Sequence, residues 1–98
     1  MTINKTQNGD QLVVALEGRL DTTTAPELEA DLKSSVDGIT RLEFDFSSLE
    51  YISSAGLRVL LSAQKVMNKQ GEMVIKNANE DIMDIFDVTG FVDILTIE

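Results

Sequence analysis

Residues 41–70, RLEFDFSSLEYISSAGLRVLLSAQKVMNKQ, contain a strand pattern followed by a helix pattern, and this order decides the class of fold. Hydrophobic and charged side chains alternate over residues 41–46, as expected for a strand with one buried face. Over residues 55–70 the aliphatic side chains recur every three or four positions, which predicts an amphipathic helix that ends at Gly71. We expect the polar segment 47–54 between these two elements to be a loop.

The residues before this stretch predict a hairpin and a helix. Residues 2–17 contain two short hydrophobic segments around an Asn-Gly pair, whose tolerance of positive φ favours a tight turn between antiparallel strands. A helix is expected to begin near Pro26, because proline suits the first turn of a helix. We expect Thr24 to be its N-cap, with Glu27 as the capping-box partner.

The residues after Gly71 predict a strand over 72–76, a short helix over 81–88 and a last edge strand over 93–97. Strands that alternate with helices favour a mostly parallel sheet. The sequence therefore predicts an α/β fold for residues 1–98 as a single domain. We expect a mixed sheet of four to five strands with an N-terminal antiparallel hairpin, together with three to four helices.

The composition narrows the classes of function. The 98 residues include no cysteine and no histidine, so disulfides, cysteine nucleophiles and the commonest general base and metal ligand are missing. We therefore expect no enzyme, no metal site and no cofactor, with a serine–lysine pair as the enzymatic alternative. The net charge of −9 argues against nucleic acid as a partner. No segment approaches the roughly 20 apolar residues that span a bilayer, so we expect a cytoplasmic protein without direct membrane insertion.

Ser53 and Ser54 stand where the predicted loop meets the predicted helix. A helix N-terminus has backbone N–H groups without partners and a partial positive charge. Either serine could cap the helix, which local sequence alone favours, or carry a phosphate that the N–H groups stabilise. The small residues Ala55 and Gly56 leave room for the active site of another protein. Close packing of the helix on the sheet is the alternative role of Gly56.

A basic row follows on the same predicted helix. Arg58, Ser62, Lys65 and Lys69 have the 4-3-4 spacing of one helical face. This face is either a solvated outer surface or part of a partner surface that begins at Ser54.

The chain resembles the STAS domain of bacterial anti-sigma factor antagonists in three blocks, LEGRLD (16–21), LEFDFS (42–47) and YISSAGLRVL (51–60). The resemblance covers about residues 3–98 in matching order, and the last block is the most specific. In this family the last block usually reads Asp-Ser-Ser/Thr-Gly-Leu, and the serine two residues before the glycine is the phosphorylation site.

The resemblance therefore implies that Ser54 is phosphorylated, with Ser53 as the second choice. Ser53 replaces the aspartate that is usual in the family, which could weaken recognition by a kinase or offer a second acceptor. Asp21 matches an acidic loop position that lies beside the switch serine in the family. The partner surface implied by the resemblance consists of Asp21, Ser53, Ser54, Gly56 and Arg58.

The function that the resemblance implies is partner switching by an anti-sigma factor antagonist. The unphosphorylated domain would bind an anti-sigma factor that has serine kinase activity, and the sigma factor would be released. Phosphorylation on Ser54 would end this binding by steric and electrostatic conflict, without refolding. A serine phosphatase would then restore the unphosphorylated domain.

The main alternative is a STAS-domain cytosolic subunit of a membrane lipid-transport system, although the doubled serine favours a kinase-controlled domain. A phosphoacceptor receiver domain, suggested by Asp45 near the end of a central strand, would also need an acidic pair and a lysine where this sequence lacks them. Asp45 matches the acid that commonly ends this strand in STAS domains. Both a direct role and the ordering of a loop remain open for it.

Overall fold

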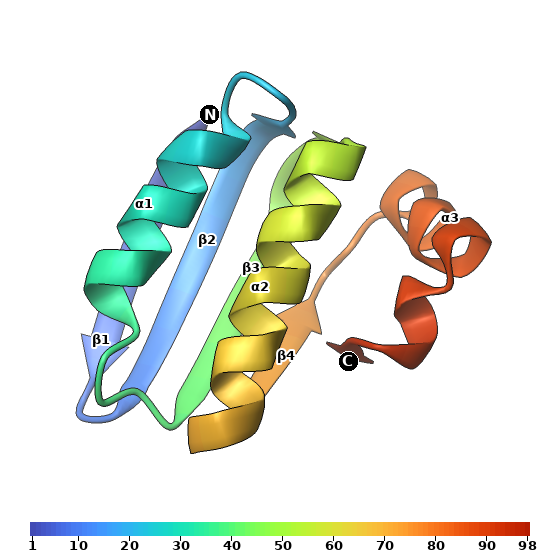
Figure 1. Ribbon diagram of the computed structural model, residues 1–98. Coiled ribbons are helices and arrows are strands. Elements are labelled where there is room, and N and C mark those ends of the chain that lie inside the picture. The colour runs from blue at the N-terminus through green and yellow to red at the C-terminus, as the bar shows by residue number, and fades with distance from the viewer.

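A computed structural model describes all 98 residues, and the elements follow the predicted order (Figure 1). They are β1 (Thr2–Asn8), β2 (Gln11–Leu20), α1 (Ala25–Ser35), β3 (Arg41–Ile52), α2 (Ser54–Gln70), β4 (Glu72–Lys76), α3 (Glu80–Thr89), a 3-10 turn (Phe91–Asp93) and β5 (Thr96–Ile97). The predicted α/β fold is confirmed, with a five-stranded mixed sheet, an N-terminal antiparallel hairpin and three α-helices.

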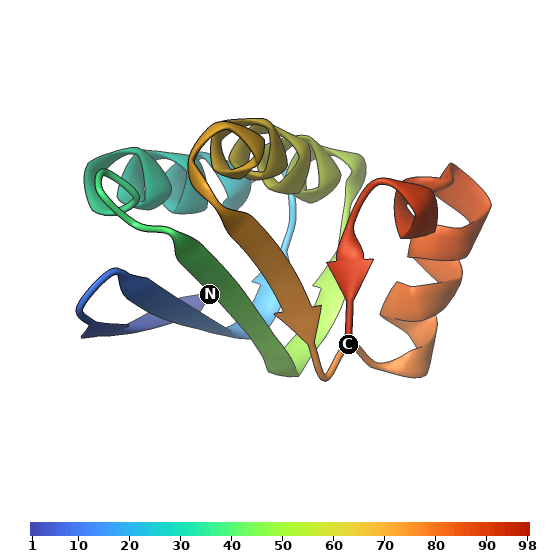
Figure 2. The ribbon, with the colours of Figure 1, turned by 90° about the horizontal axis from the view of Figure 1, so that it is seen from below.

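The five strands lie side by side in the order of the sequence, and only the β1–β2 pair is antiparallel. α1 and α2 cover one face of the sheet, whereas α3 lies at the far edge, beyond β4 (Figure 1, Figure 2). The carboxyl ends of β2 and β3 and the N-termini of α1 and α2 all lie at one end of the molecule. The connections after β2 and β3 are therefore neighbours in space.

The core explains the alternating pattern in β3. Leu42, Phe44 and Phe46 are fully buried, and the two phenylalanine rings lie 5.8 Å apart. Leu60 and Met67 on the inner face of α2 are buried to the same degree and belong to the same hydrophobic core. The charged residues of β3 that alternate with the core residues lie on the helix-free face, where Arg41 and Glu43 form ion pairs with each other and with Glu72 and Lys76 of β4.

The polar segment 47–54 is not a loop, contrary to the prediction. β3 continues to Ile52, and its last residues pair with the end of β2, where Leu20 lies opposite Ile52. Leu49 and Ile52 are buried, which holds this half of the strand on the core. Two shifts of register in the β2–β3 ladder break the alternation of buried and exposed residues. This irregularity explains why the segment has no strand pattern in the sequence.

The C-terminal edge contains less strand than predicted. Only Thr96–Ile97 pairs with β4, because Asp93 ends the 3-10 turn Phe91–Asp93 and the N–H groups of Ile94 and Leu95 donate back to the carbonyl of Phe91. The strand over 72–76 agrees with the prediction, and α3 is longer than predicted by one residue at each end. None of the helices has the length and apolar character that crossing a membrane would require.

Candidate functional site

The ends of β2 and β3 meet the N-terminus of α2 at one end of the molecule (Figure 1). Leu20 and Ile52, the last residues of the two strands, lie opposite each other. The backbone N–H of Ser53 then donates a hydrogen bond of 2.9 Å to the carbonyl of Leu20. Because Asp21 follows Leu20 directly, this bond holds Asp21 beside the entrance of the helix. Ser54 is the first residue of that helix.

Ser53 is the N-cap of α2. Its backbone is extended, with φ −100° and ψ 176°, and its carbonyl accepts the N–H of Leu57 at 3.0 Å. Its hydroxyl oxygen accepts the N–H of Gly56 at a long 3.5 Å. Aspartate and serine are both strong N-caps, so serine in place of the aspartate usual in STAS domains preserves this role. The capping role considered from the sequence thus falls to Ser53.

Ser54 occupies the first helical position, and its side chain is exposed. Since the cap bond uses the hydroxyl of Ser53, the hydroxyl of Ser54 is the one at this entrance that is accessible and free of the cap. An anion attached there would lie near the N–H groups of the first turn, which have no partner within the helix. The helical repeat places Arg58, also exposed, one turn further along the same face.

Gly56 is buried because α2 begins very close to the sheet. A Cβ atom on Gly56 would lie 2.7 Å from Cγ of Leu20 and 2.8 Å from Cγ1 of Ile52, and both of these side chains are buried. The structure therefore contains the close packing of helix on sheet that was the alternative role for Gly56. Gly56 can contribute to a partner surface through the position that it gives to Ser54.

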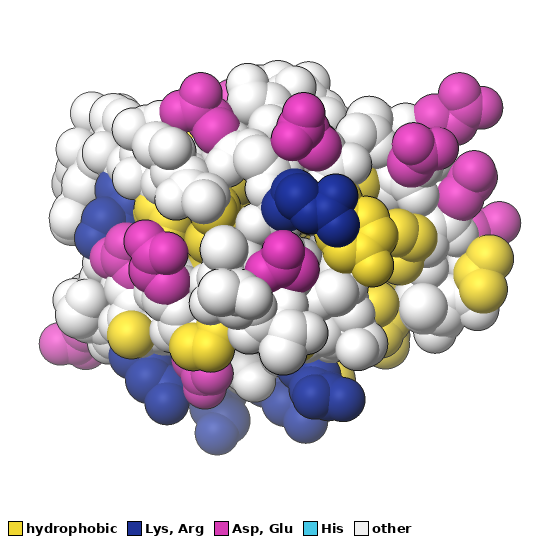
Figure 3. All heavy atoms as spheres, turned by 90° about the horizontal axis from the view of Figure 1, so that it is seen from above, with side chains coloured by type: hydrophobic (Ala, Val, Ile, Leu, Met, Phe, Trp, Pro, Cys, Tyr) yellow, Lys and Arg dark blue, Asp and Glu magenta, His cyan; other side chains and the backbone are white.

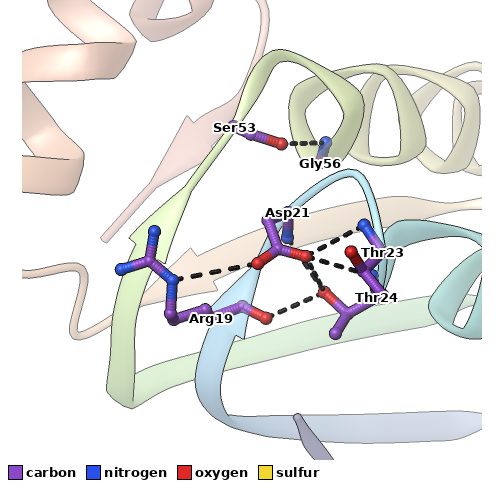
Figure 4. Close-up of polar contacts among 6 residues, drawn as sticks. All are labelled: Arg19, Asp21, Thr23, Thr24, Ser53 and Gly56. Atoms are coloured by element: carbon purple, nitrogen blue, oxygen red, sulfur yellow. Dashed lines mark hydrogen bonds and ion pairs between the residues drawn. The ribbon is translucent and has the colours of Figure 1, made fainter.

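Asp21 is the first residue of the connection from β2 to α1, and its carboxylate accepts hydrogen bonds from the backbone of that connection (Figure 4). Its Oδ1 accepts the backbone N–H groups of Thr23 at 3.0 Å and of Thr24 at 3.2 Å. The bond from the Thr24 N–H is the main cause that lowers the pKa of Asp21, and the positive charge of Arg19 lowers it further. The carboxylate beside the entrance of α2 therefore keeps its negative charge to a lower pH than an ordinary aspartate does.

The predicted capping box of Thr24 and Glu27 does not form. Thr24 stands at the N-cap position of α1, but its side chain makes no cap bond. Instead its hydroxyl donates to the carbonyl of Arg19 at 2.8 Å and accepts the N–H of Asp21 at 2.9 Å. The threonine side chain thus ties the start of α1 to the end of β2 and helps to hold the Asp21 carboxylate in place.

Arg19 and Tyr51 also lie at this end of the molecule, and the sequence pattern predicts a site role for neither of them. They lie opposite each other near the ends of β2 and β3, with the guanidinium of Arg19 at 4.3 Å from the centroid of the Tyr51 ring. Nε of Arg19 also lies 3.8 Å from Oδ2 of Asp21 (Figure 4). The register of β2 and β3 brings these residues together. A loop over 47–54, as expected from the sequence, would not have placed Tyr51 opposite Arg19.

This end of the molecule presents mixed charge in spite of the net charge of −9 (Figure 3). Acidic side chains are scattered over it and gather on the side of α3. Basic side chains lie near its centre, against hydrophobic surface, and others gather along the edge formed by α1 and α2. A partner that approaches this end therefore meets separate acidic and basic areas.

Asp45 lies away from this group. It is in the middle of β3, and the alternation of the strand places its side chain on the helix-free face. Its Oδ1 accepts the side-chain amide of Asn77 and the N–H of Ser47, each at 3.0 Å, and the Asn77 bond is the largest cause that lowers the pKa of Asp45. Asn77 begins the connection from β4 to α3. Of the two roles considered for Asp45, the geometry supports the ordering of a connection.

Comparison with known proteins gives the family. The model of the STAS domain matches residues 2–98. The chain belongs to the STAS domain family. It is 39% identical over 88 residues to a protein of Bordetella bronchiseptica named "Putative anti-sigma factor antagonist BtrV", and the match covers 88% of this chain and 76% of that protein. It is 29% identical over 98 residues to the anti-sigma-B factor antagonist of Bacillus subtilis, with 99% of this chain and 90% of that protein covered.

The fold of this STAS domain agrees with that of solved antagonists. The crystal structure of an anti-sigma factor antagonist from Mycobacterium paratuberculosis has a TM-score of 0.89 and 24% sequence identity, with 98% of this chain and 83% of that chain covered. The predicted relationship to anti-sigma factor antagonists is confirmed at the level of the family.

Proposed function

We propose that this STAS domain is an anti-sigma factor antagonist whose switch is phosphorylation of Ser54. The observation that carries the proposal is the exposed hydroxyl at the first position of α2, in a chain whose relatives are anti-sigma factor antagonists. Ser53 stays the N-cap, because its hydroxyl is engaged with the N–H of Gly56. The proposed partner surface includes Asp21, next to the entrance of α2, and Arg58, one helical turn after the acceptor.

A phosphate on Ser54 suits the helix that carries it but conflicts with an interface. It would add about −1.5 to −2 charges. The N–H groups of the first turn of α2 would stabilise these charges, so the fold needs no rearrangement. In a complex the phosphate would be desolvated against the partner. A loss of about 3 kcal/mol, as for an uncompensated buried charge, would weaken binding roughly a hundredfold.

In the proposed cycle the unphosphorylated domain binds an anti-sigma factor with serine kinase activity, and this frees the sigma factor. The kinase transfers the γ-phosphoryl group of ATP to Oγ of Ser54, the hydroxyl proton is lost and ADP leaves. A serine phosphatase later hydrolyses the ester with water and restores the hydroxyl. In this cycle the chain is a binding protein and a substrate in the cytoplasm, and it performs no catalysis itself.

Affinity capture from the cells of origin tests the switch, with the wild type, Ser54→Ala and Ser54→Asp as baits. The alanine variant should retain an anti-sigma factor of the kinase type, and the aspartate variant should lose it because of the added charge. Ser53→Ala is the matched control, since it removes the neighbouring hydroxyl and leaves Ser54 intact. Equal capture by the alanine and aspartate variants of Ser54 would contradict the proposal.

The captured kinase then tests the acceptor directly. Incubation with ATP should add the mass of one phosphate to the wild type and to Ser53→Ala, but not to Ser54→Ala. Phosphorylation that persists in Ser54→Ala and disappears in Ser53→Ala would move the switch to Ser53. A subunit of a lipid transporter would instead bring down a membrane protein with every bait alike.

A further inference from the structure

The chain has eight lysine and arginine residues, and most of them lie in ion pairs within the molecule. The paired cations are Lys5, Arg19, Lys33, Arg41 and Lys76. Arg58, Lys65 and Lys69 have no acidic partner, and all three belong to α2. Acidic residues outnumber basic residues by 17 to 8, yet these three cations have no acidic partner within the chain. They can therefore attract an acidic group of another molecule.

These three cations form one row, which we call the α2 row, and Ser54 lies at its end. Arg58 follows Ser54 by four residues, Lys65 follows Arg58 by seven and Lys69 follows by four more, so all four side chains share one helical face. All four are exposed. With a rise of 1.5 Å per residue, the α2 row spans roughly 16 Å from Arg58 to Lys69. This length matches about three turns of a helix.

An apolar groove between α1 and α2 runs beside the α2 row. It has a volume of about 320 Å³, and Val66 in its wall is 41% exposed. Its apolar lining consists of Leu32, Val36, Val59, Ala63 and Val66. A second hollow of about 440 Å³ shares Glu29, Val59 and Ser62 with this groove and reaches Ala55 and Arg58. The charge of Glu29 is compensated by Lys33, which also lines the groove, at 3.3 Å. The groove therefore leads from the middle of the helix layer to the residue next to Ser54.

We propose that an acidic, amphipathic segment of the partner protein docks along α2. Its carboxylates lie on Arg58, Lys65 and Lys69, and its aliphatic side chains lie in the groove beside them. This inference rests on the proposed function and adds the chemistry of the segment that the anti-sigma factor contributes. The exposed Ser54 lies at one end of the docked segment, within reach of the kinase domain that the segment brings to it.

Charge complementarity selects this kind of occupant. The net charge of −9 repels nucleic acid and anionic membranes as a whole. A protein segment can present anions and aliphatic groups together at the spacing of the row and the groove. A second copy of this chain is the rival occupant, because the outer face of α3 carries acidic side chains without ion-pair partners. These are Glu80, Asp81, Asp84 and Asp87.

The docking mode gives a phosphate on Ser54 a second effect. Arg58 lies one helical turn after Ser54, so the phosphate would pair with Arg58 and withdraw it from the docked segment. The phosphate would also repel the carboxylates of the segment. Release of the partner would therefore involve the α2 row as well as the immediate surroundings of Ser54.

The test compares two variants that lower the net charge by the same two units. Lys65→Gln with Lys69→Gln removes two cations of the α2 row, whereas Thr6→Glu with Thr96→Glu adds two anions on exposed positions of the sheet. Calorimetry with the anti-sigma factor should show binding about tenfold weaker for the lysine variant and changed less than twofold for the control. Raising the salt concentration to about 0.5 M should remove most of this difference.

The outcomes separate this inference from the proposed function. Equal affinities of the two variants, with Ser54 still phosphorylated and still controlling binding, would overturn the α2 row alone. Weaker binding of the lysine variant with no effect of Ser54→Asp would support the α2 row and overturn the switch. Failure of the wild type to bind any anti-sigma factor would overturn both.

Photo-cross-linking identifies the occupant. A benzoylphenylalanine at position 62, between the row and the groove, should cross-link to a segment of the anti-sigma factor rich in aspartate and glutamate. The same group at position 6 on β1 is the control and should give no cross-link. A cross-link from position 62 to a basic or uncharged segment would overturn the proposal. A cross-link to α3 of a second copy would replace it with self-association.

Discussion

Ser53 and Ser54 are neighbours in the chain, but α2 begins at Ser54, so only the second serine is a helical residue. Ser53 lies outside the helix in an extended conformation, and its hydroxyl accepts the N–H of Gly56. Ser54 lies inside the helix, and its side chain faces solvent. Substitutions at position 53 should therefore change the stability of the fold, whereas substitutions at position 54 should change the binding of a partner.

The phosphate on Ser54 should have a lower second pKa when Arg58 is present, because a nearby cation favours the more highly charged form. An exposed pair one helical turn apart contributes about 0.3 to 0.5 kcal/mol. Since 1.36 kcal/mol corresponds to a change of 1 in pKa, Arg58→Gln should raise the phosphate pKa by about 0.2 to 0.4. A ³¹P NMR titration of the two phosphorylated proteins measures this difference.

Lys69→Gln provides the control for this titration, because Lys69 lies at the far end of the α2 row and cannot contact the phosphate. Its phosphate pKa should equal that of the wild type. An identical pKa in the wild type and in Arg58→Gln would show that the phosphate does not pair with Arg58.

Gly56→Ala should destabilise the domain even though alanine is the better helix former. The new methyl group would lie 2.7 Å from Leu20 and 2.8 Å from Ile52, and both are part of the core. Overpacking of this kind costs about 1 to 3 kcal/mol, in spite of a gain of about 1 kcal/mol from helix propensity. Urea unfolding should show the loss. Leu20→Ala should cost less in the Gly56→Ala background than alone, and purely additive effects would contradict the steric explanation.

The cap of α2 is a property of the whole element, because it determines where the helix begins. Ser53→Ala should lower the free energy of unfolding by about 0.5 to 1 kcal/mol, at the low end for a cap because the bond is long. Ser53→Asp should retain the wild-type stability, since aspartate also caps and its charge suits a helix N-terminus. Urea unfolding measures both, with Ser54→Ala as the control. A larger loss of stability in Ser54→Ala than in Ser53→Ala would show that Ser54, and not Ser53, caps the helix.

The sequence predicts most elements of this fold because their patterns are local. Regular alternation identifies the first half of β3, and helical spacing identifies α1, α2 and α3. The second half of β3 could not be predicted, because its pairing depends on register shifts with β2 that no local pattern contains. For the same reason the local pattern predicts that Thr24 caps α1, whereas its hydroxyl donates to the carbonyl of Arg19 at the end of β2.

The residues of the candidate site also differ in how far the local sequence predicts them. Ser53, Ser54 and Gly56 lie within four positions of the chain and form a motif, so they can be identified from the sequence alone. The contact of Arg19 with Tyr51 requires β3 to reach Ile52 beside β2, so it depends on tertiary structure. Sequence motifs therefore indicate the acceptor serine, but the surface around that serine requires the fold.

The whole molecule separates its charges into areas that differ in their balance. On the helix-free face of the sheet, Glu43 contacts both Arg41 and Lys76, so opposite charges there compensate one another. The outer face of α2 has unpaired cations and the outer face of α3 has unpaired anions. A partner would therefore be oriented by the two helices, and the compensated sheet face would contribute little to long-range attraction.

Asp45 connects this sheet face to α3 through Asn77, so the acid stability of the whole domain should depend on it. Its pKa in the folded chain lies below the ordinary value of 3.8, chiefly because of the Asn77 hydrogen bond. The charged carboxylate therefore stabilises the fold at pH values above 3.8. This contribution is lost as the pH falls through 3.8 and below the lowered pKa of the folded chain. Asp45→Asn keeps an acceptor oxygen but removes the charge. It should be less stable than the wild type by about 1 kcal/mol near pH 7.

Near pH 2, below the ordinary value of 3.8, the charge of Asp45 contributes less to stability than at pH 7, so the difference between Asp45→Asn and the wild type should shrink. Urea unfolding at the two pH values measures both gaps. Asp84→Asn on the outer face of α3 removes one carboxylate that has no ion-pair partner, and it should change the stability by less than about 0.5 kcal/mol at either pH. A gap for Asp45→Asn that persists or widens in acid would mean that the amide disturbs the connection to α3 sterically, and that the charge of Asp45 does not stabilise it.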